Sequence, residues 1–183
     1  VGHENPDADT LGSTLAICRM VERARGRATA VFADPIPPLY HFLPDVERAL
    51  TDPDPDADYD LLVVSDCGSL DRIGAVVARH PTVFDRLPRV VLDHHASNDS
   101  RGDGEWIDPA AAATCEMTTL LAVRLGVPLD EGNVALASLL MAGVVMDTST
   151  FAHPNTTPRT LAVSAALVEA GAPLSDISRR LYR

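Results

Sequence analysis

Two short apolar runs constrain the fold of this chain more than any other feature. They are YDLLVVSD, residues 59–66, and RVVLDHH, residues 89–95. Both are rich in β-branched residues and do not alternate with polar ones, which is typical of strands buried on both faces of a parallel sheet. A weaker run of the same kind, ATAVFAD, covers residues 28–34 and predicts a third strand.

Helical patterns separate these runs. They cover residues 10–26, 69–80 and 111–126, and beyond about residue 130 only helical patterns remain. In that last part Thr157 and Pro158 suit the N-cap and first position of a helix. Strands that alternate with helices wind into a sheet through right-handed crossovers. We therefore expect an α/β fold: a parallel twisted sheet flanked by helices on both faces, with a helical C-terminal part.

Composition narrows the class of protein. A chain of 183 residues that is 46% hydrophobic can bury one core, so we expect a single domain. Its net charge of −11 argues against a general affinity for nucleic acid backbones or anionic membranes, and no apolar run reaches membrane-spanning length. Three cysteines without a CxxC motif argue against a disulfide scaffold or a thiolate zinc site, which favours a reducing, cytoplasmic setting.

Aspartates and histidines lie in four segments, at strand ends or after apolar runs: VGHENPDADT at the start, LLVVSD, VVLDHH and GVVMDTST. In an open parallel sheet the loops after the strands converge on one crevice. The side chains expected to meet there are His3, Asp7, Asp9, Asp66, His94 and Asp147.

The charge of this set predicts metal ions. Its four carboxylates carry −4, which two divalent cations would balance. Imidazole and carboxylate without thiolate suit Mn²⁺, with Mg²⁺, Fe²⁺, Co²⁺ and Zn²⁺ as competitors. The turn around Pro6 can aim His3 and Asp7 at one ion while Asp9 reaches the other, with Asp66 as the bridge.

Each signal also has a simpler interpretation. NPDAD can be an ordinary turn, an aspartate after a strand can cap the next helix, and DHH can be a capping or packing pair. The occurrence of all four signals at strand ends or after apolar runs favours the metal site.

The segments GHENPDADTLGS, VVSDCGSLDRIG, VLDHHASN and MAGVVMDTSTFAHPNTTPRT resemble, in order, the four motifs of the DHH phosphoesterases. The resemblance is strongest to the bifunctional oligoribonuclease (nano-RNase) and pAp phosphatase group, and it extends from residue 2 to about residue 165. It implies a first ion held by His3, Asp7 and Asp66, and a second held by Asp9, Asp66, His94 and Asp147.

The resemblance also implies roles for the residues beside the ions. His95 would face the scissile phosphate as a catalytic and substrate-binding residue, Asp93 would orient the histidines, and Asn98 would help to shape the same loop and to bind substrate. Asp66 would be catalytic through its bridging role. Asn155, Thr156 and Thr157 look like a helix start.

The implied function is hydrolysis of phosphate esters in short oligoribonucleotides, pAp or cyclic-dinucleotide products, by a hydroxide shared between two metal ions. Three alternatives stay open: a pyrophosphatase or exopolyphosphatase, a single-strand DNA exonuclease, and a non-catalytic nucleotide-sensing module. A net charge of −11 and an aromatic content of 4% disfavour the exonuclease.

The resemblance further implies partners outside this sequence. Residues 1–183 would form the DHH catalytic domain, without the strand that precedes it in the family or the C-terminal lobe that binds substrate, so the isolated domain is expected to have low activity. We expect short RNA or a nucleotide as substrate and no membrane partner. The apolar segments 135–145 and 161–171 suit either a homodimer contact or a buried core.

Overall fold

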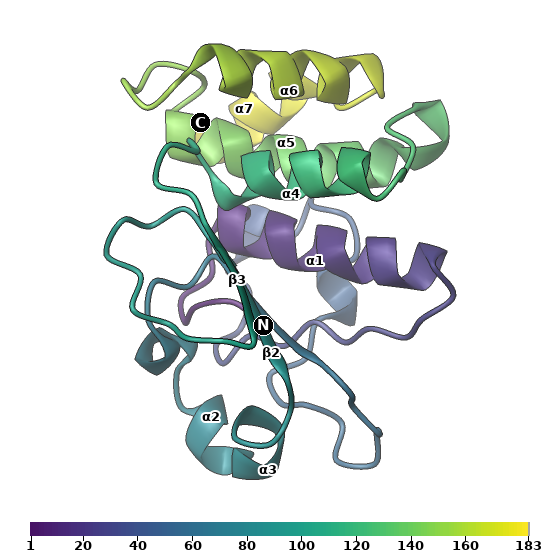
Figure 1. The fold of residues 1–183 in the computed structure, drawn as a ribbon. Coiled ribbons are helices and arrows are strands. Elements are labelled where there is room, and N and C mark those ends of the chain that lie inside the picture. Colours follow the sequence, from purple (N-terminus) through teal and green to yellow (C-terminus); the bar gives the residue numbers. More distant parts are fainter. Residues whose placement is uncertain (183) are drawn as a thin grey trace.

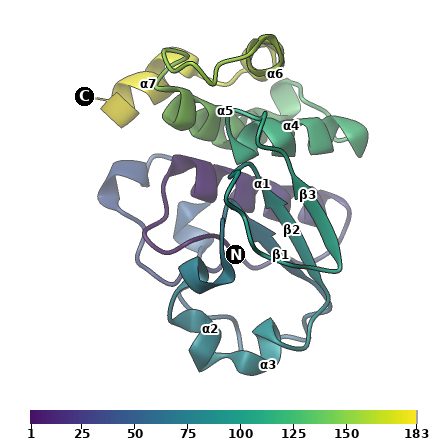
Figure 2. The same ribbon diagram turned by 60° about the vertical axis from the view of Figure 1, so that its left-hand side comes forward.

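The computed structural model describes residues 1–182. At its centre is a parallel sheet of three strands in the order β1-β2-β3 (Figures 1 and 2). The strands are β1 (Leu62–Ser65), β2 (Arg89–Asp93) and β3 (Gly104–Ile107). Val64 pairs with Val91, and Leu92 pairs with Trp106. The two central runs of the sequence therefore form neighbouring parallel strands, as predicted.

The described residues form seven α-helices around this sheet: α1 (Ala8–Arg23), α2 (Val76–Arg79), α3 (Pro81–Phe84), α4 (Thr114–Arg124), α5 (Val134–Thr148), α6 (Pro158–Glu169) and α7 (Leu174–Tyr182). Short 3₁₀ turns cover Pro38–Tyr40, Val46–Arg48, Leu70–Ile73 and Glu131–Asn133. In Figure 1, α1 lies between the sheet and the pair α4 and α5, α6 and α7 form the outermost layer, and α2 and α3 lie at the opposite end.

The sheet is covered on both faces. Val91 packs with Val76 of α2 and Phe84 of α3, whereas the next residue, Leu92, packs with Met117 of α4. Successive side chains of a strand point to opposite faces, so these contacts place helices on either side of the sheet. The predicted fold class is confirmed.

Helix α5 is the centre of the helical half. It is apolar around its whole circumference, as expected for a helix buried among other helices. A Cβ at Gly12 of α1 would lie 2.4 Å from the carbonyl oxygen of Leu139, and one at Gly143 would lie 2.4 Å from Oδ1 of Asp9. The two glycines therefore allow α1 and α5 to approach closely, which brings Asp9 against α5.

Residues 28–34 do not form a strand, so that prediction is wrong. They make one parallel bridge, Val31 to Leu50, in which the Phe32 amide donates to the Leu50 carbonyl and the Leu50 amide to the Ala30 carbonyl. Pro35 and Pro53 follow closely on the two segments. Because proline has no amide hydrogen to donate, the pairing stops there.

Two further elements differ from the sequence prediction. The helix expected over residues 69–80 is a 3₁₀ turn followed by α2, because Gly74 between them has a left-handed φ of 91°. Strand β3 was missed. It lies at the edge of the sheet, its two end residues are half-buried and its two middle residues exposed, and it contains no apolar run.

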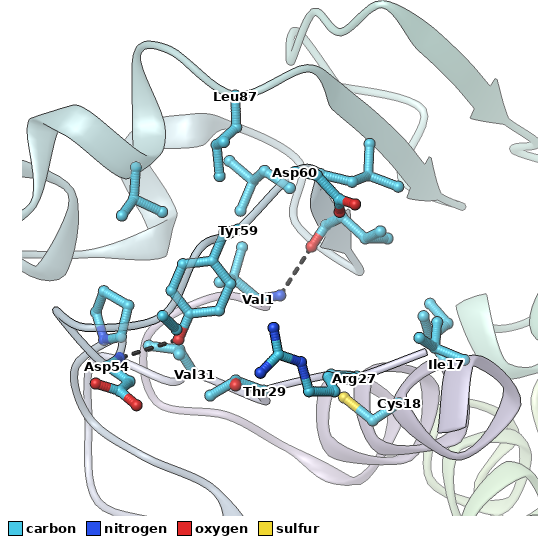
Figure 3. Close-up of a pocket in the computed structure, with 18 of the residues that line it drawn as sticks. Val1, Ile17, Cys18, Arg27, Thr29, Val31, Asp54, Tyr59, Asp60 and Leu87 are labelled. Atoms are coloured by element: carbon cyan, nitrogen blue, oxygen red, sulfur yellow. Dashed lines mark hydrogen bonds between the residues drawn. The ribbon is translucent and has the colours of Figure 1, made fainter. Parts of the chain in front are cut away.

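A cavity of about 400 Å³ lies beside β1 (Figure 3). The amino group of Val1 donates to the carbonyl of Val63 at 2.8 Å, and the carbonyl of Val1 accepts from the amide of Ser65, so residue 1 runs alongside β1. Thr29 and Val31 line the cavity across from β1.

Within residues 1–182 no single helix is both long and apolar enough to cross a membrane. Only α6 and α7 taken together, bent by 112°, reach that length and apolarity. Their inward residues Val163, Leu167, Ile177 and Leu181 are buried in this fold.

Candidate metal centre

The six predicted ligands come together at the carboxyl ends of β1 and β2. Asp66 follows β1 and His94 follows β2, while residues 3–9 lead into α1 and Asp147 lies in the last turn of α5. Three groups have donor atoms within 4.8 Å of one another: His3, Asp7 and Asp66 form the first, Asp9, His94 and Asp147 the second, and Asp66, His94 and His95 the third. The convergence expected from the strand ends is thus present in the structure.

The first group is arranged around His3. Nδ1 of His3 lies 2.6 Å from the carbonyl oxygen of Glu4, so it carries the proton and donates it there. This leaves Nε2 free, 3.9 Å from Oδ2 of Asp7 and 3.8 Å from Oδ2 of Asp66. The tautomer of His3 is therefore the one that can bind a cation.

One carboxylate oxygen of Asp7 caps a helix, and the other faces the proposed metal site. Its Oδ1 accepts the amides of Asp9 and Thr10 at 2.9 and 3.0 Å and so caps α1. Its Oδ2 belongs to the first group, facing His3. The helix cap fixes the carboxylate without using the oxygen that faces the site.

The second group is arranged around His94. Nδ1 of His94 lies 3.3 Å from the carbonyl oxygen of Ala111, and Nε2 lies 3.1 Å from Oδ2 of Asp147 and 3.9 Å from Oδ2 of Asp9. Nε2 is also 3.7 Å from Oδ1 of Asp66. The two oxygens of Asp66 therefore face different groups, Oδ2 the first and Oδ1 the second.

Asp9 is tied to the start of α4. Its two oxygens accept the amides of Thr114 and Cys115 at 2.7 and 2.8 Å. The N-cap position of α4 is Ala113, which has no polar side chain, so a carboxylate from α1 satisfies these donors instead. Sequence reasoning missed this contact because its partners lie more than 100 residues apart.

In the absence of a cation, burial and the repulsion between carboxylates favour the protonated forms of the acidic side chains. Desolvation, followed by the charges of neighbouring carboxylates, raises the pKa of Asp9 and of Asp66. Burial lowers the pKa of His94, but its hydrogen bond to Asp147 and the charges of Asp9 and Asp147 outweigh this and raise that pKa to about 10. The site thus retains protons where cations would replace them.

The donor set fits divalent cations. Carboxylate oxygens and imidazole nitrogens are ligands that Mn²⁺ and related ions accept. The nearest thiol, Cys115, is fully buried, and desolvation and the charge of Asp9 raise its pKa, so it stays neutral and is no ligand.

His95 is held separately from His94. Its Nδ1 donates to Oδ1 of Asp93 at 2.8 Å, and Asn98 donates from Nδ2 to Oδ2 of Asp93 and to the carbonyl of Cys67. The hydrogen bond to Asp93 raises the pKa of His95. Asp93 was expected to orient both histidines, but the contact is to His95, and His94 is oriented by the Ala111 carbonyl instead.

The exposed fractions indicate the open side of the site. The side chains of Asp9 and Asp66 are 1% and 3% exposed, whereas those of His95 and Asp7 are 34% and 39% exposed. The site is therefore open to solvent at His95 and Asp7.

The helix start expected at residues 155–157 is present, and Asn155 also connects two other parts of the site. Thr157 caps α6 through a reciprocal capping box with Thr160. Asn155 donates to the carbonyl oxygens of Ala112 and Asp147 at 3.1 and 3.2 Å, which ties the loop before α4 to the end of α5.

The contacts of Thr10 and Thr114 with Asp66 were also missed. Their hydroxyls lie 2.6 and 3.1 Å from its two carboxylate oxygens. Nothing in the local sequence distinguishes a threonine that reaches across the fold in this way.

Comparison with known proteins gives one family. Residues 1–144 match the N-terminal domain of the DHH family. The chain is 33% identical over 183 residues to the bifunctional oligoribonuclease and PAP phosphatase NrnA of Thermus thermophilus, covering 98% of this chain and 52% of that protein. It is 28% identical over 181 residues to NrnA of Bacillus subtilis, covering 98% of this chain and 55% of that protein.

Solved structures share the fold. An exopolyphosphatase-related protein from Bacteroides fragilis superposes with a TM-score of 0.84 at 20% identity, covering 99% of this chain and 54% of that one. A putative family II inorganic pyrophosphatase from Methanococcus jannaschii gives a TM-score of 0.73 at 17% identity, covering 99% and 58%. The chain spans about half the length of the curated relatives it matches.

Proposed function

Because this chain belongs to the DHH family, we propose that it is the catalytic domain of a phosphoesterase that uses two divalent cations. The observation that carries this proposal is the position of Asp66. Its two oxygens face two separate groups of ligands, as a carboxylate shared by a pair of ions requires.

The proposed ligands are those expected from the sequence. His3, Asp7 and Asp66 would hold the first cation, and Asp9, Asp66, His94 and Asp147 the second. We propose Mn²⁺ for both, since the set mixes imidazole with carboxylate. When bound, such cations would act as Lewis acids that lower the pKa of water and stabilise charge on phosphoryl oxygens.

His95 is the proposed catalytic residue on the substrate side. Its Nδ1 is committed to Asp93, so its other ring nitrogen is available to a phosphate on the open side of the site. The carboxylate of Asp93 favours the protonated, cationic imidazole, which would neutralise charge on the phosphate or donate a proton to the leaving oxygen. Asn98 is proposed to act beside it by holding Asp93 and its loop in place.

The proposed substrates are short oligoribonucleotides, pAp or products of cyclic dinucleotides. This choice is supported by the full-length relatives named oligoribonuclease and PAP phosphatase. We further propose that the remainder of the longer protein supplies the positive charge for the nucleotide, since this chain carries 26 acidic against 15 basic residues. Three free thiols support a reducing, cytoplasmic setting.

The test is a substrate panel with the longer protein that contains this chain. With Mn²⁺, we expect release of mononucleotide or phosphate from dinucleotides, a cyclic dinucleotide product or pAp, and much slower release from pyrophosphate and single-stranded DNA. The matched control is Asp66→Asn, which keeps the size of the side chain and should be inactive. Pyrophosphate as the best substrate would contradict the proposed substrate class, and no hydrolysis of any member would contradict the proposed enzyme.

A further inference from the structure

Two buried hydroxyls converge on the proposed bridging carboxylate. Oγ1 of Thr10 donates to Oδ2 of Asp66 at 2.6 Å, and Oγ1 of Thr114 donates to Oδ1 of the same residue at 3.1 Å. Both threonines are 0% exposed. They begin different helices, Thr10 in the first turn of α1 and Thr114 at the first residue of α4. The carboxylate is thus held by both helices at once.

Each oxygen of Asp66 accepts one hydroxyl and faces a histidine of one ligand group. Oδ2 has Thr10 at 2.6 Å and His3 Nε2 at 3.8 Å. Oδ1 has Thr114 at 3.1 Å and His94 Nε2 at 3.7 Å, and Nδ1 of His95, which donates to Asp93, lies 3.8 Å away. An ionised carboxylate offers about four lone-pair sites, two on each oxygen. When one site of each oxygen accepts a hydroxyl, the remaining sites are left for the two ligand groups.

Three other buried threonines, in α4 and α5, use their hydroxyls differently. Thr118 and Thr119 of α4 and Thr148 of α5 donate to the carbonyl four residues earlier in their own helix. This is the ordinary local use of a helical threonine. Thr10 and Thr114 reach across the fold instead, so ordinary helix packing does not account for their contacts.

The backbone of Asp66 does not by itself set the direction of its carboxylate. Its φ of 55° lies in the left-handed region, which an aspartate adopts at some cost. The amide of Asp66 is fixed by the Leu92 carbonyl, but this contact does not set the rotation of the carboxylate. The hydrogen bonds from Thr10 and Thr114 set this rotation.

We propose that Thr10 and Thr114 are positioning residues that make Asp66 a bridge between two cations. Thr10 orients Oδ2 toward the cation of His3 and Asp7, and Thr114 orients Oδ1 toward the cation of Asp9, His94 and Asp147. This inference rests on the proposed function, because it assigns roles toward the same two cations.

The experiment compares Mn²⁺ binding to the longer protein and its variants Thr10→Val and Thr114→Val. Valine keeps the shape of threonine and removes the donor. Isothermal titration should resolve two ions in the wild type, and each variant should weaken binding of one ion by about 10- to 100-fold, as expected when a group that orients a metal ligand is lost. Mn²⁺ electron paramagnetic resonance should show coupling of the two ions in the wild type and its reduction in both variants.

Thr119→Val is the matched control. It removes a buried hydroxyl from α4 that does not contact Asp66, so it should bind both ions as the wild type does. Thr10→Ser and Thr114→Ser retain the donor and should restore binding. If a valine variant does not fold, the serine and alanine variants at that position give the same comparison, with alanine expected to bind weakly.

The outcomes separate this inference from the proposed function. Two coupled ions in the wild type with unchanged binding in both valine variants would overturn the role of the threonines and leave the two-cation site intact. Equal losses in Thr119→Val would also overturn it, by showing an effect of general packing. A wild type that binds no cation would contradict the proposed function itself.

Discussion

His94 and His95 are neighbours in sequence with different surroundings. Nε2 of His94 faces three carboxylates of the site, whereas Nδ1 of His95 is paired with Asp93 and its side chain is about one third exposed. Their ring centroids are 4.6 Å apart, with the ring planes inclined at 56°. The backbone after β2 thus directs one imidazole toward the proposed cations and the other toward the substrate side.

This difference predicts different phenotypes for the two histidines. His95→Gln should retain Mn²⁺ affinity within a few-fold and lower kcat by about 100- to 10,000-fold, the range for loss of a general acid. His94→Gln should weaken binding of one ion. Metal titration and steady-state kinetics on the same preparations measure both effects. Loss of an ion in His95→Gln would contradict the assigned roles.

At the scale of elements, the site depends on the close packing of α1, α4 and α5. Asp9 of α1 accepts the first amides of α4, and Gly143 of α5 lies directly against Asp9 and Cys115. The helices therefore position a proposed ligand through backbone contacts rather than through other side chains of the site.

Gly143→Ala should disturb this arrangement. The added methyl would meet Oδ1 of Asp9 and Sγ of Cys115 at 2.4 Å, so α5 must move, at a cost of about 1–3 kcal/mol in the free energy of unfolding. Chemical denaturation measures the loss. Gly104→Ala is the control, because its methyl would meet only Val90 at an ordinary 3.6 Å. Equal stability of the two variants would contradict the close packing described.

The sequence predicted the elements whose signals are local. Residues 61–66 and 89–95 combine an apolar run with the polar residues that follow it, so both the strands and the polar residues at their ends could be recognised. Strand β3 could not, because its half-exposed residues form no apolar run. The contact of Thr114 with Asp66 could not be predicted either, because it joins residues 48 positions apart and depends on where the start of α4 lies in the fold.

At the scale of the whole molecule, the buried charges link stability to pH and metal. The pKa values of Asp9 and Asp66 lie above their ordinary range, and that of His94 is raised to about 10. Groups with a raised pKa bind protons more tightly in the folded state. Their contribution is complete below the ordinary pKa and is lost as pH rises through the folded one. Without metal, the stabilising contribution of His94 is therefore lost as pH rises from 6.5 toward about 10, and that of Asp9 and Asp66 is lost as pH rises above 3.8.

Mn²⁺ should reverse this trend by replacing the protons. We expect the increase in Tm on adding Mn²⁺ to be larger at pH 8 than at pH 5.5, because fewer protons compete for the ligands. Differential scanning fluorimetry with and without the ion measures this difference. An increase that is the same at both pH values would contradict the linkage.

The cavity beside β1 leads to a prediction about the longer protein. Val1 already pairs with Val63 and Ser65, and Val31 lines the opposite wall. We expect residues that precede Val1 in the longer protein to continue this pairing as a strand through the cavity. Hydrogen exchange at the amide of Val63 should then be slower than in residues 1–183 alone. Equal exchange in the two proteins would contradict this expectation.

The central claim is that Asp66 is shared by two cations. Crystals of the protein grown with Mn²⁺ and measured at the manganese absorption edge test it directly. The structure predicts two anomalous peaks, one beside Oδ2 of Asp66 with His3 and Asp7, and the other beside Oδ1 with Asp9, His94 and Asp147. A single peak, or two peaks that do not share Asp66, would contradict the claim.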